Sequence, residues 1–297
     1  METQQELRKR IQNTQGLHSV VHTMKTLSAV NIRQYEKAMR SLREYYRTVS
    51  MGLSVVLRDA TERIEETSAG EPEAPVAAII YGSEQGMAGQ FNRRIIEFTG
   101  HTLVQEMGLE LPSVRVATLG TRIIPRLEDA GFTVEKGLSI GGSTADMAPS
   151  MIELLELIEH WRSEAGVGRI LLFYNRLTSG VSFEPSVSYL LPISPDLLQE
   201  HEQQQTEWKG RTRPAYFSEW RELVSALIQQ HLYVSLNRGF IESLAGENAS
   251  RLSTMQAAES NIEEQLEHLK QNYNRLRQNS ITQEMMDIIT GFEALQD

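Results

Sequence analysis

Cysteine is absent from the 297 residues of this chain. Its absence excludes disulfides, thiolate-bound metals, iron–sulfur clusters and cysteine nucleophiles. Proline is absent from both ends, since the first is Pro72 and the last is Pro214. Because proline interrupts helices, both ends are free to form helices of unusual length.

Long apolar runs are also missing, and the mean hydropathy is −0.35. No run approaches the roughly 20 apolar residues that span a bilayer. The opening residues, METQQELRKRIQ, contain no apolar stretch of the kind found in a secretory signal. We expect that the chain neither crosses a membrane nor carries an export signal.

Positive charge is scarce: the chain has 29 Lys and Arg residues and 39 Asp and Glu residues, which gives a net charge of −10. This balance argues against nucleic-acid binding, which needs a basic surface. The charge is unevenly spread, with +6 over residues 1–58, −12 over 59–206 and −4 over 207–297. Three segments with different surroundings are therefore indicated.

The N-terminal segment, residues 4–58, predicts one long helix. Steps of three and four residues select fifteen positions between Leu7 and Val56, of which eleven are apolar or aromatic. A sustained seven-residue repeat of this kind is typical of coiled coils. The polar exceptions gather between Thr14 and Ser28, which indicates that this stretch faces something other than one dry helix.

The C-terminal segment shows the same repeat and predicts a helix from about residue 216 to 290. The spacing is kept, with one polar position, by Leu252, Met255, Glu259, Ile262, Leu266, Leu269, Tyr273 and Leu276. Such a helix would be about 110 Å long at about 1.5 Å per residue, which exceeds what a compact domain covers. Two such helices at opposite ends of one chain predict an antiparallel coiled coil.

The middle of the chain alternates between strand and helix patterns. Strands are expected at 76–81, 114–119, 132–136, 169–174 and 186–191, and helices at 92–107, 122–129 and 151–161. This alternation favours a Rossmann-like α/β domain with a small, mostly parallel sheet. Polar segments at 71–75 and 194–214 are interpreted as linkers. The predicted parts are 1–60 (first long helix), 74–194 (α/β domain) and 208–297 (second long helix).

The turn from Gly82 to Gly89 is the motif most suggestive of ligand chemistry. It follows an expected strand and precedes an expected helix, where glycines would let a phosphate approach backbone amides. However, its spacing is Gly-x-x-x-Gly-x-x-Gly, no Gly-Lys-Ser/Thr follows, and Glu84 places a negative charge at the phosphate position. We therefore interpret it as a tight strand-to-helix turn.

Two histidines, His18 and His22, lie one turn apart on the first helix and form half of a zinc site. The sequence shows no third ligand, and the intervening Ser19-Val20-Val21 lacks the glutamate of a metalloprotease motif. We therefore interpret both histidines as polar packing or solvent-facing residues.

No other motif predicts catalysis. The serines around Gly180 lack a nucleophile-elbow pattern, and Trp161, Trp208 and Trp220 are interpreted as packing residues. A basic series fits either a solvated face or a face for an acidic partner, at Arg8, Lys9, Arg10, Arg33, Lys37, Arg40, Arg43 and Arg47. We expect no catalytic residue, no cofactor and no metal in this chain.

Short motifs at both ends resemble a known family. They are LRKRIQNT at 7–14 and TMKTLSAV at 23–30, then ENASRLSTM at 247–255, YNR at 273–275 and RQNSITQE at 277–284. MMDIITGFEAL at 285–295 continues the last motif, and GMAGQFN at 86–92 resembles the family's glycine-rich turn. Together they resemble, over the whole chain and in order, the gamma subunit of rotary, F-type ATP synthases.

The resemblance implies a rotor. In that family the paired terminal helices form a central shaft inside a ring of alternating alpha and beta subunits. The α/β domain lies below, against the epsilon subunit and the membrane c-ring. The shaft has no active site, and its asymmetric faces hold the three beta subunits in different states, which couples ion-driven rotation to ATP synthesis or hydrolysis. The implied location is peripheral, on the cytoplasmic face of the bacterial inner membrane, with membrane association only through the complex.

The resemblance also implies partner contacts. Five residues match those that touch the catch loops of the beta subunit: Arg277, Gln278, Thr282, Gln283 and Glu284. Met24 and Lys25 match the neighbouring contact on the first helix. The tip at 285–295 is implied to turn in a largely apolar sleeve.

Three departures favour a divergent form, such as the alternative ATPases of some bacteria. Residues 84–89 are EQGMAG where the family usually has DRGLCG, Asn31 stands where lysine is usual, and the net charge is acidic rather than basic. The missing cysteine argues against a thiol-regulated chloroplast subunit. In this family the coupled ion, proton or sodium, is chosen by the ring subunit.

Two other functions are compatible with the residues. One is a free-standing coiled-coil adaptor with an α/β ligand-binding domain, and the other is a nucleotide-binding enzyme that uses the turn at 82–89. A rotor predicts tight association with alpha and beta subunits and no nucleotide affinity of the isolated chain. An enzyme predicts ATP or NAD binding, and an adaptor predicts stable long helices without any hexamer.

Overall fold

The computed structural model describes residues 3–58, 74–139, 147–178, 182–193 and 216–293. The chain divides into two compact units. We call residues 1–29 with 251–297 the coiled-coil unit, and residues 30–250 the sheet unit. The expected linker at 194–214, together with Gly180 and Trp208, lies outside the described residues.

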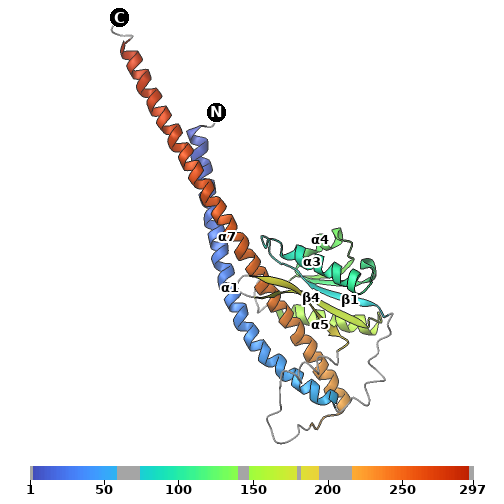
Figure 1. Ribbon diagram of the computed structural model, residues 1–297. Helices are drawn as coiled ribbons and strands as arrows, with labels where there is room; N and C mark the ends of the chain where they lie inside the picture. Colours follow the sequence, from blue (N-terminus) through green and yellow to red (C-terminus); the bar gives the residue numbers. More distant parts are fainter. Residues whose placement is uncertain (1–2, 59–73, 140–146, 179–181, 194–215, 294–297) are drawn as a thin grey trace. The chain divides into compact units, whose positions relative to one another are not determined.

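Two long helices contribute residues to both units (Figure 1). They are α1 (Gln4–Arg58) and α7 (Trp220–Glu293), so both expected helices are confirmed. α7 begins at Trp220, four residues later than expected. The lack of proline shows that a helix is possible here, but it does not indicate at which residue the helix begins. The Trp220 indole donates to the carbonyl oxygen of Val56 at 3.4 Å, which ties this start to α1. Among the described helices, none has the length and hydropathy needed to cross a bilayer.

The two helices run antiparallel within the sheet unit. The Asn31 side-chain amide donates to Asn248 Oδ1 at 3.3 Å, and the Tyr45 hydroxyl donates to Gln230 Oε1 at 2.8 Å. Rising residue numbers on α1 therefore meet falling numbers on α7, as the two heptad repeats predict.

A five-stranded sheet forms the centre of the sheet unit. Its strands are β1 (Val76–Tyr81), β2 (Arg115–Leu119), β3 (Val134–Leu138), β4 (Arg169–Leu177) and β5 (Phe183–Leu191). The spatial order is β3-β2-β1-β4-β5, with parallel pairing everywhere except between β4 and β5. The expected Rossmann-like, mostly parallel sheet is confirmed, and the antiparallel edge strand makes it mixed.

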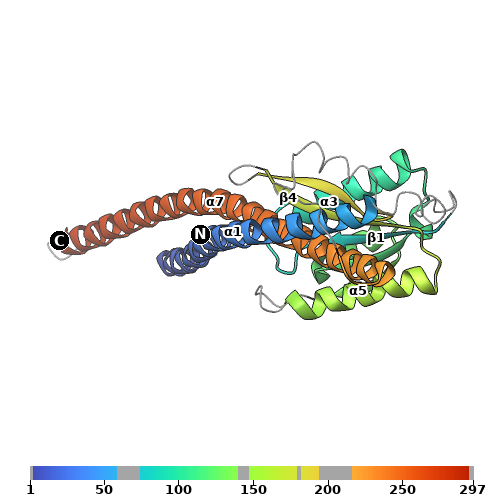
Figure 2. The same ribbon diagram turned by 90° about the horizontal axis from the view of Figure 1, so that it is seen from below.

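Helices cover both faces of the sheet. On one face lie α3 (Phe91–His101) and α4 (Ile124–Asp129), as Figure 1 shows, with Ala78 and Ile80 of β1 in the core beneath them. On the other face lie α5 (Met147–Ser163), visible in Figure 2, and part of α7. All six residues of β1 are buried, since successive side chains of a strand point to opposite faces and both faces are covered.

Several element boundaries differ from the sequence expectations. β3 begins at Val134 rather than at 132, because Phe132 packs into the core beside α4. The helix expected over 92–107 is α3 followed by a π-helical turn, η1 (Thr102–Glu106). Two 3₁₀ turns, η2 (Leu111–Ser113) and η3 (Thr121–Ile123), flank β2.

Two glycines allow α7 to pack closely on β4. A Cβ at Gly239 would lie 2.8 Å from Leu172 Cδ2, and a Cβ at Gly246 would lie 3.2 Å from the carbonyl oxygen of Asn175. Glycine costs about 1 kcal/mol relative to alanine inside a helix. The two glycines let α7 approach β4 closely, because no side chain lies between the helix and the strand at these positions.

We predict that Gly246→Leu destabilises the sheet unit by about 2 kcal/mol or more, because the added side chain has no space beside the Asn175 carbonyl. The matched control is Gly16→Leu on α1, where a Cβ meets nothing within 4 Å. That control should be neutral or stabilising by up to about 1 kcal/mol. Urea unfolding followed by circular dichroism measures both, and equal stability of the two variants would contradict close packing at Gly246.

Candidate functional site

An apolar seam joins α1 to α7 in the coiled-coil unit. Its buried centre is formed by Val21, Met255, Ile262 and Leu266, all at expected heptad positions. Partly buried apolar residues packed against this centre are Ile11, Met24 and Ala258. Burying each large apolar side chain contributes about 1.5–3 kcal/mol, so this seam holds the two helices together. Met24, an expected contact residue, therefore packs partly into the seam.

A polar layer, which we define as His18, His22, Lys25, Glu259 and Glu263, crosses the same unit. Glu259, with 13% of its side chain exposed, is in contact with Lys25 Nζ and lies 2.8 Å from His22 Nδ1. One turn along each helix, His18 Nε2 lies 3.3 Å from Glu263 Oε1. These polar exceptions to the repeat of α1 therefore face carboxylates of α7, which the sequence interpretation did not foresee.

The position of Glu259 changes its acidity. The hydrogen bonds from Lys25 and His22 lower the pKa of the Glu259 carboxyl below its ordinary value, while partial desolvation opposes the shift. The carboxylate is therefore favoured in the folded chain. Lys25, an expected contact residue, is held in place by this carboxylate.

The remaining expected contact residues lie on an exposed stretch of α7. Exposed polar residues there are Arg277, Gln278, Thr282, Gln283 and Glu284. Every residue from 281 to 290 is exposed, including large apolar side chains at Ile281 (46% exposed), Met285 (59%), Met286 (54%), Ile288 (72%) and Ile289 (48%). Concentrated exposed apolar surface of this kind marks a protein interaction site.

The structure does not bring the two groups of expected contact residues together. Lys25 lies level with Glu259 on α7, and Arg277 follows Glu259 by 18 residues. At about 1.5 Å per residue, the two groups are separated by about 27 Å along the helix. The expected contact residues therefore lie at two different heights of the coiled-coil unit.

The turn from Gly82 to Gly89 is filled by groups of its own chain. The Ser83 backbone N–H donates to Asn92 Oδ1 at 2.9 Å, and the Thr121 N–H donates to Glu84 Oε2 at 3.2 Å. The Gln85 N–H, a second amide of the turn, donates to Glu247 Oε1 at 3.4 Å, so two backbone amides of the turn are already bonded within the chain. This geometry agrees with a tight strand-to-helix turn.

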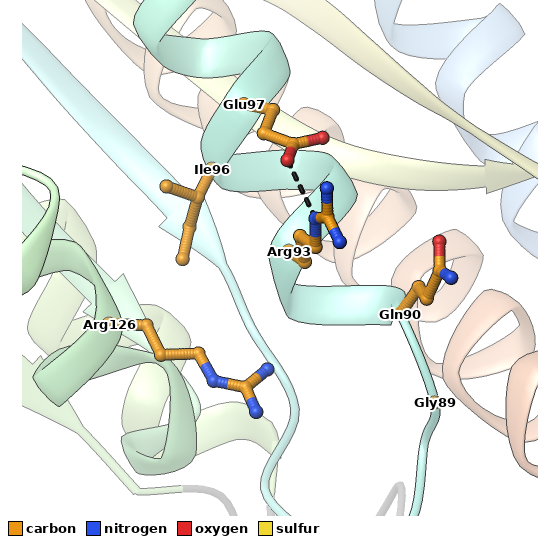
Figure 3. Close-up of a pocket in the computed structure, with 6 residues that line it drawn as sticks. All are labelled: Gly89, Gln90, Arg93, Ile96, Glu97 and Arg126. Carbon is orange, nitrogen blue, oxygen red and sulfur yellow. Dashed lines mark hydrogen bonds and ion pairs between the residues drawn. The ribbon is translucent and has the colours of Figure 1, made fainter.

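A surface hollow of about 370 Å³ lies next to this turn, lined by Gly89, Gln90, Arg93, Ile96, Glu97 and Arg126. Figure 3 shows Arg93 beside Glu97, with Nε and Oε1 2.7 Å apart, and Arg126 extending from α4. These six side chains include no nucleophile, and the one carboxylate is exposed and paired with Arg93. The hollow therefore lacks the groups that catalysis would require.

A polar cluster around the buried Glu242 in the sheet unit was not predicted from the sequence. Arg238 Nε donates to Glu242 Oε1 at 3.0 Å, and its guanidinium lies 5.4 Å from the ring centre of Tyr46. Burial, and next the negative charge of Glu242, raise the pKa of the nearby Tyr174. The spacing of four residues between Arg238 and Glu242 predicts an ordinary ion pair on the surface of a helix. No local signal shows that Glu242 is only 3% exposed.

These features define a class of protein: a coiled coil made from both ends of one chain, with an α/β unit between them, that acts through contacts with other subunits. A family model described as ATP synthase matches residues 3–295. The chain therefore belongs to the ATP synthase family, and the resemblance seen in its two ends is confirmed.

Curated relatives named ATP synthase gamma chain match the chain from end to end. The one from Anaeromyxobacter sp. strain Fw109-5 is 28% identical over 304 residues and covers 100% of both chains. The one from Geotalea uraniireducens is 25% identical over 296 residues and covers 98% of both.

Solved structures share the fold. The rotor of the Euglena gracilis mitochondrial ATP synthase contains a chain that matches with a TM-score of 0.61 at 18% identity, covering 94% of this chain and 98% of that one. A chain in the OSCP/F1/c-ring structure from the same organism matches with a TM-score of 0.65 at 17% identity, covering 98% and 94%.

We predict that Glu259→Gln lowers the melting temperature of the coiled-coil unit at neutral pH, and that the loss disappears in acid. A carboxyl whose folded-state pKa is depressed stabilises the fold above its unfolded pKa. That contribution fades as the pH falls below the ordinary value of 4.5 and through the lowered one. Thermal unfolding between pH 3 and pH 8, followed by circular dichroism, measures the difference from wild type.

The matched control for this prediction is Glu264→Gln, at an exposed position of the same helix. It should leave the pH dependence of the melting temperature close to that of wild type. A difference between wild type and Glu259→Gln that stays constant down to pH 3 would show that the lowered pKa does not contribute to stability.

Proposed function

We propose that the chain is the central rotor shaft of a membrane-bound rotary ATP synthase, and a non-catalytic subunit of it. The observation that carries the proposal is the exposed end of α7. A helix with five large apolar side chains in water, next to five polar contact residues, is suited to a surrounding protein sleeve. Membership of the ATP synthase family and the end-to-end match to gamma chains support the same role.

The proposed mechanism is coupling by differential contact. Ion-driven rotation of the c-ring turns the shaft, and each orientation presents a different face to the three catalytic beta subunits. A shaft changes the state of a beta subunit only by contacting one conformation better than another. The same coupling, run in reverse, lets ATP hydrolysis drive ion pumping.

The proposed partners follow from this role. They are the alpha and beta subunits around the coiled coil, with the epsilon subunit and the c-ring against the α/β part. The similar chains from Euglena gracilis come from structures described as a rotor and as OSCP, F1 and c-ring. We assign no nucleic acid and no nucleotide to this chain.

The proposed contacts with the beta subunits are made at two heights. The upper region on α7 comprises Arg277, Gln278, Thr282, Gln283 and Glu284, all exposed. The second region comprises Met24 and Lys25, which the apolar seam and Glu259 hold in place. The exposed charges of the upper region suit contacts that must form and break during rotation, because exposed ion pairs are worth only about 0–1 kcal/mol.

As a member of this family, the chain is a peripheral subunit of a membrane complex. We propose the cytoplasmic face of a bacterial inner membrane as its location, with membrane association only through the complex. The bacterial sources of the curated relatives support this location. The division into parts at 1–60, 74–194 and 208–297 remains a prediction, in which the first and last parts serve as one shaft.

The first test of this function is association. We predict that the chain, isolated from its native membrane in mild detergent, co-purifies with alpha and beta subunits in a complex that hydrolyses ATP, while the isolated chain binds neither ATP nor NAD. Affinity purification with subunit identification by mass spectrometry measures the first, and equilibrium dialysis the second. Recovery of the chain alone would contradict the rotor, and nucleotide binding would favour an enzyme.

The second test addresses the exposed contact residues. We predict that Arg277→Glu combined with Glu284→Lys reduces ATP synthesis by the reconstituted complex about fivefold or more, the range of typical coupling energies. The melting temperature of the chain should change little, since both residues are exposed. The measurement is ATP synthesis in proteoliposomes under an imposed ion gradient.

The matched control exchanges Lys270→Glu with Glu264→Lys, two exposed residues of the same helix outside the proposed contact region. This variant should retain most of the synthesis rate. If both double variants lose activity equally, the assignment of contacts to Arg277 and Glu284 fails while the rotor role stands.

A further inference from the structure

The polar layer brings together a set of groups with metal-binding chemistry. One ligand atom each from His18, Glu259 and Glu263 lie within 4.8 Å of one another. The sequence supplied only the two histidines, and the third ligand it lacked comes from the facing helix. The coiled coil therefore completes a group that neither helix contains alone.

His22 lies beside this group on α1 and is bound to one of its carboxylates. Its Nδ1 lies 2.8 Å from Glu259 Oε1, and its ring stacks near that of His18 with centroids 6.3 Å apart and planes 15° from parallel. Two histidines spaced four residues apart on α1 thus face two glutamates spaced four residues apart on α7. Zinc is also held by three protein ligands with nitrogen and oxygen donors, and water then takes the fourth position.

The surroundings favour a ligated carboxylate at Glu259. Its second oxygen, Oε2, contacts Lys25 Nζ, which leaves Oε1 toward the histidines. A hydrogen-bond donor behind a ligating carboxylate fixes its orientation, as outer partners do in known metal sites. Lys25 would therefore act as a positioning residue, because it binds Oε2 of Glu259 and leaves Oε1 available to the metal ion.

The donor types also restrict the ion. Imidazole nitrogens suit zinc, copper, nickel and cobalt, whereas magnesium and calcium prefer all-oxygen sites. We propose that His18, Glu259 and Glu263, with His22 beside them, form a site for a divalent transition-metal ion such as Zn²⁺. The ion bridges α1 and α7 and thereby clamps the two helices of the coiled-coil unit against each other.

The experiment is titration of the purified full-length chain with Zn²⁺, by calorimetry in a buffer that does not chelate metals. We expect one Zn²⁺ per chain, no displacement by excess Mg²⁺, and a higher melting temperature with Zn²⁺ than without it. His18→Ala and Glu263→Gln should each weaken binding by at least about tenfold, as loss of a ligand requires. Both residues lie at the surface, and circular dichroism verifies that each variant keeps its helix content.

The matched controls are His268→Ala and Glu264→Gln, two exposed residues of α7 in the same unit. They should bind Zn²⁺ as wild type does. As a second readout, Co²⁺ bound to wild type should give visible absorption bands of imidazole coordination, and His18→Ala should reduce them. Absence of binding, or a loss in the control variants equal to that in His18→Ala and Glu263→Gln, overturns the proposal.

Discussion

The structure depends on the antiparallel pairing of α1 with α7. In the coiled-coil unit, this pairing buries a seam centred on Val21 and Ile262. In the sheet unit, α7 adds Leu236 and Phe240 to the core of the sheet. One helix with buried side chains in both units links the ends of the chain to its middle. Neither end could bury its apolar stripe alone, because isolated long helices leave that stripe in water.

The coiled-coil unit is not uniformly apolar, and part of its polar groups are matched across the two helices. Lys25 and the two histidines of α1 meet Glu259 and Glu263 of α7. A polar layer of this kind gives less stability than an apolar one would. It does fix register, because slipping one helix along the other would leave these charges unpaired. The same layer supports both the proposed position of Lys25 and the proposed metal site.

Among the described residues, the turn at 82–89 and the hollow beside it are occupied by interactions within the chain. In the sheet unit, the backbone amides of Ser83 and Gln85 in the turn at 82–89 are bonded to Asn92 and Glu247. Arg93 and Glu97 neutralise each other beside the adjacent hollow. The exposed features are instead apolar and polar side chains along the end of α7. A rotor requires many weak contacts that exchange during rotation, and exposed residues around Met285 and Glu284 are suited to them.

The two long helices, their antiparallel pairing, the mostly parallel sheet and the family were predictable from the sequence, since heptad and strand–helix periodicities and short motifs are local patterns. It did not reveal that Glu242 is buried, that Gly246 lies against Asn175, or that His18 faces Glu263. Those facts depend on which surfaces meet after folding. A helix surface position has the same local signal whether water, a strand or another helix covers it, so these contacts follow from the packing of the folded chain.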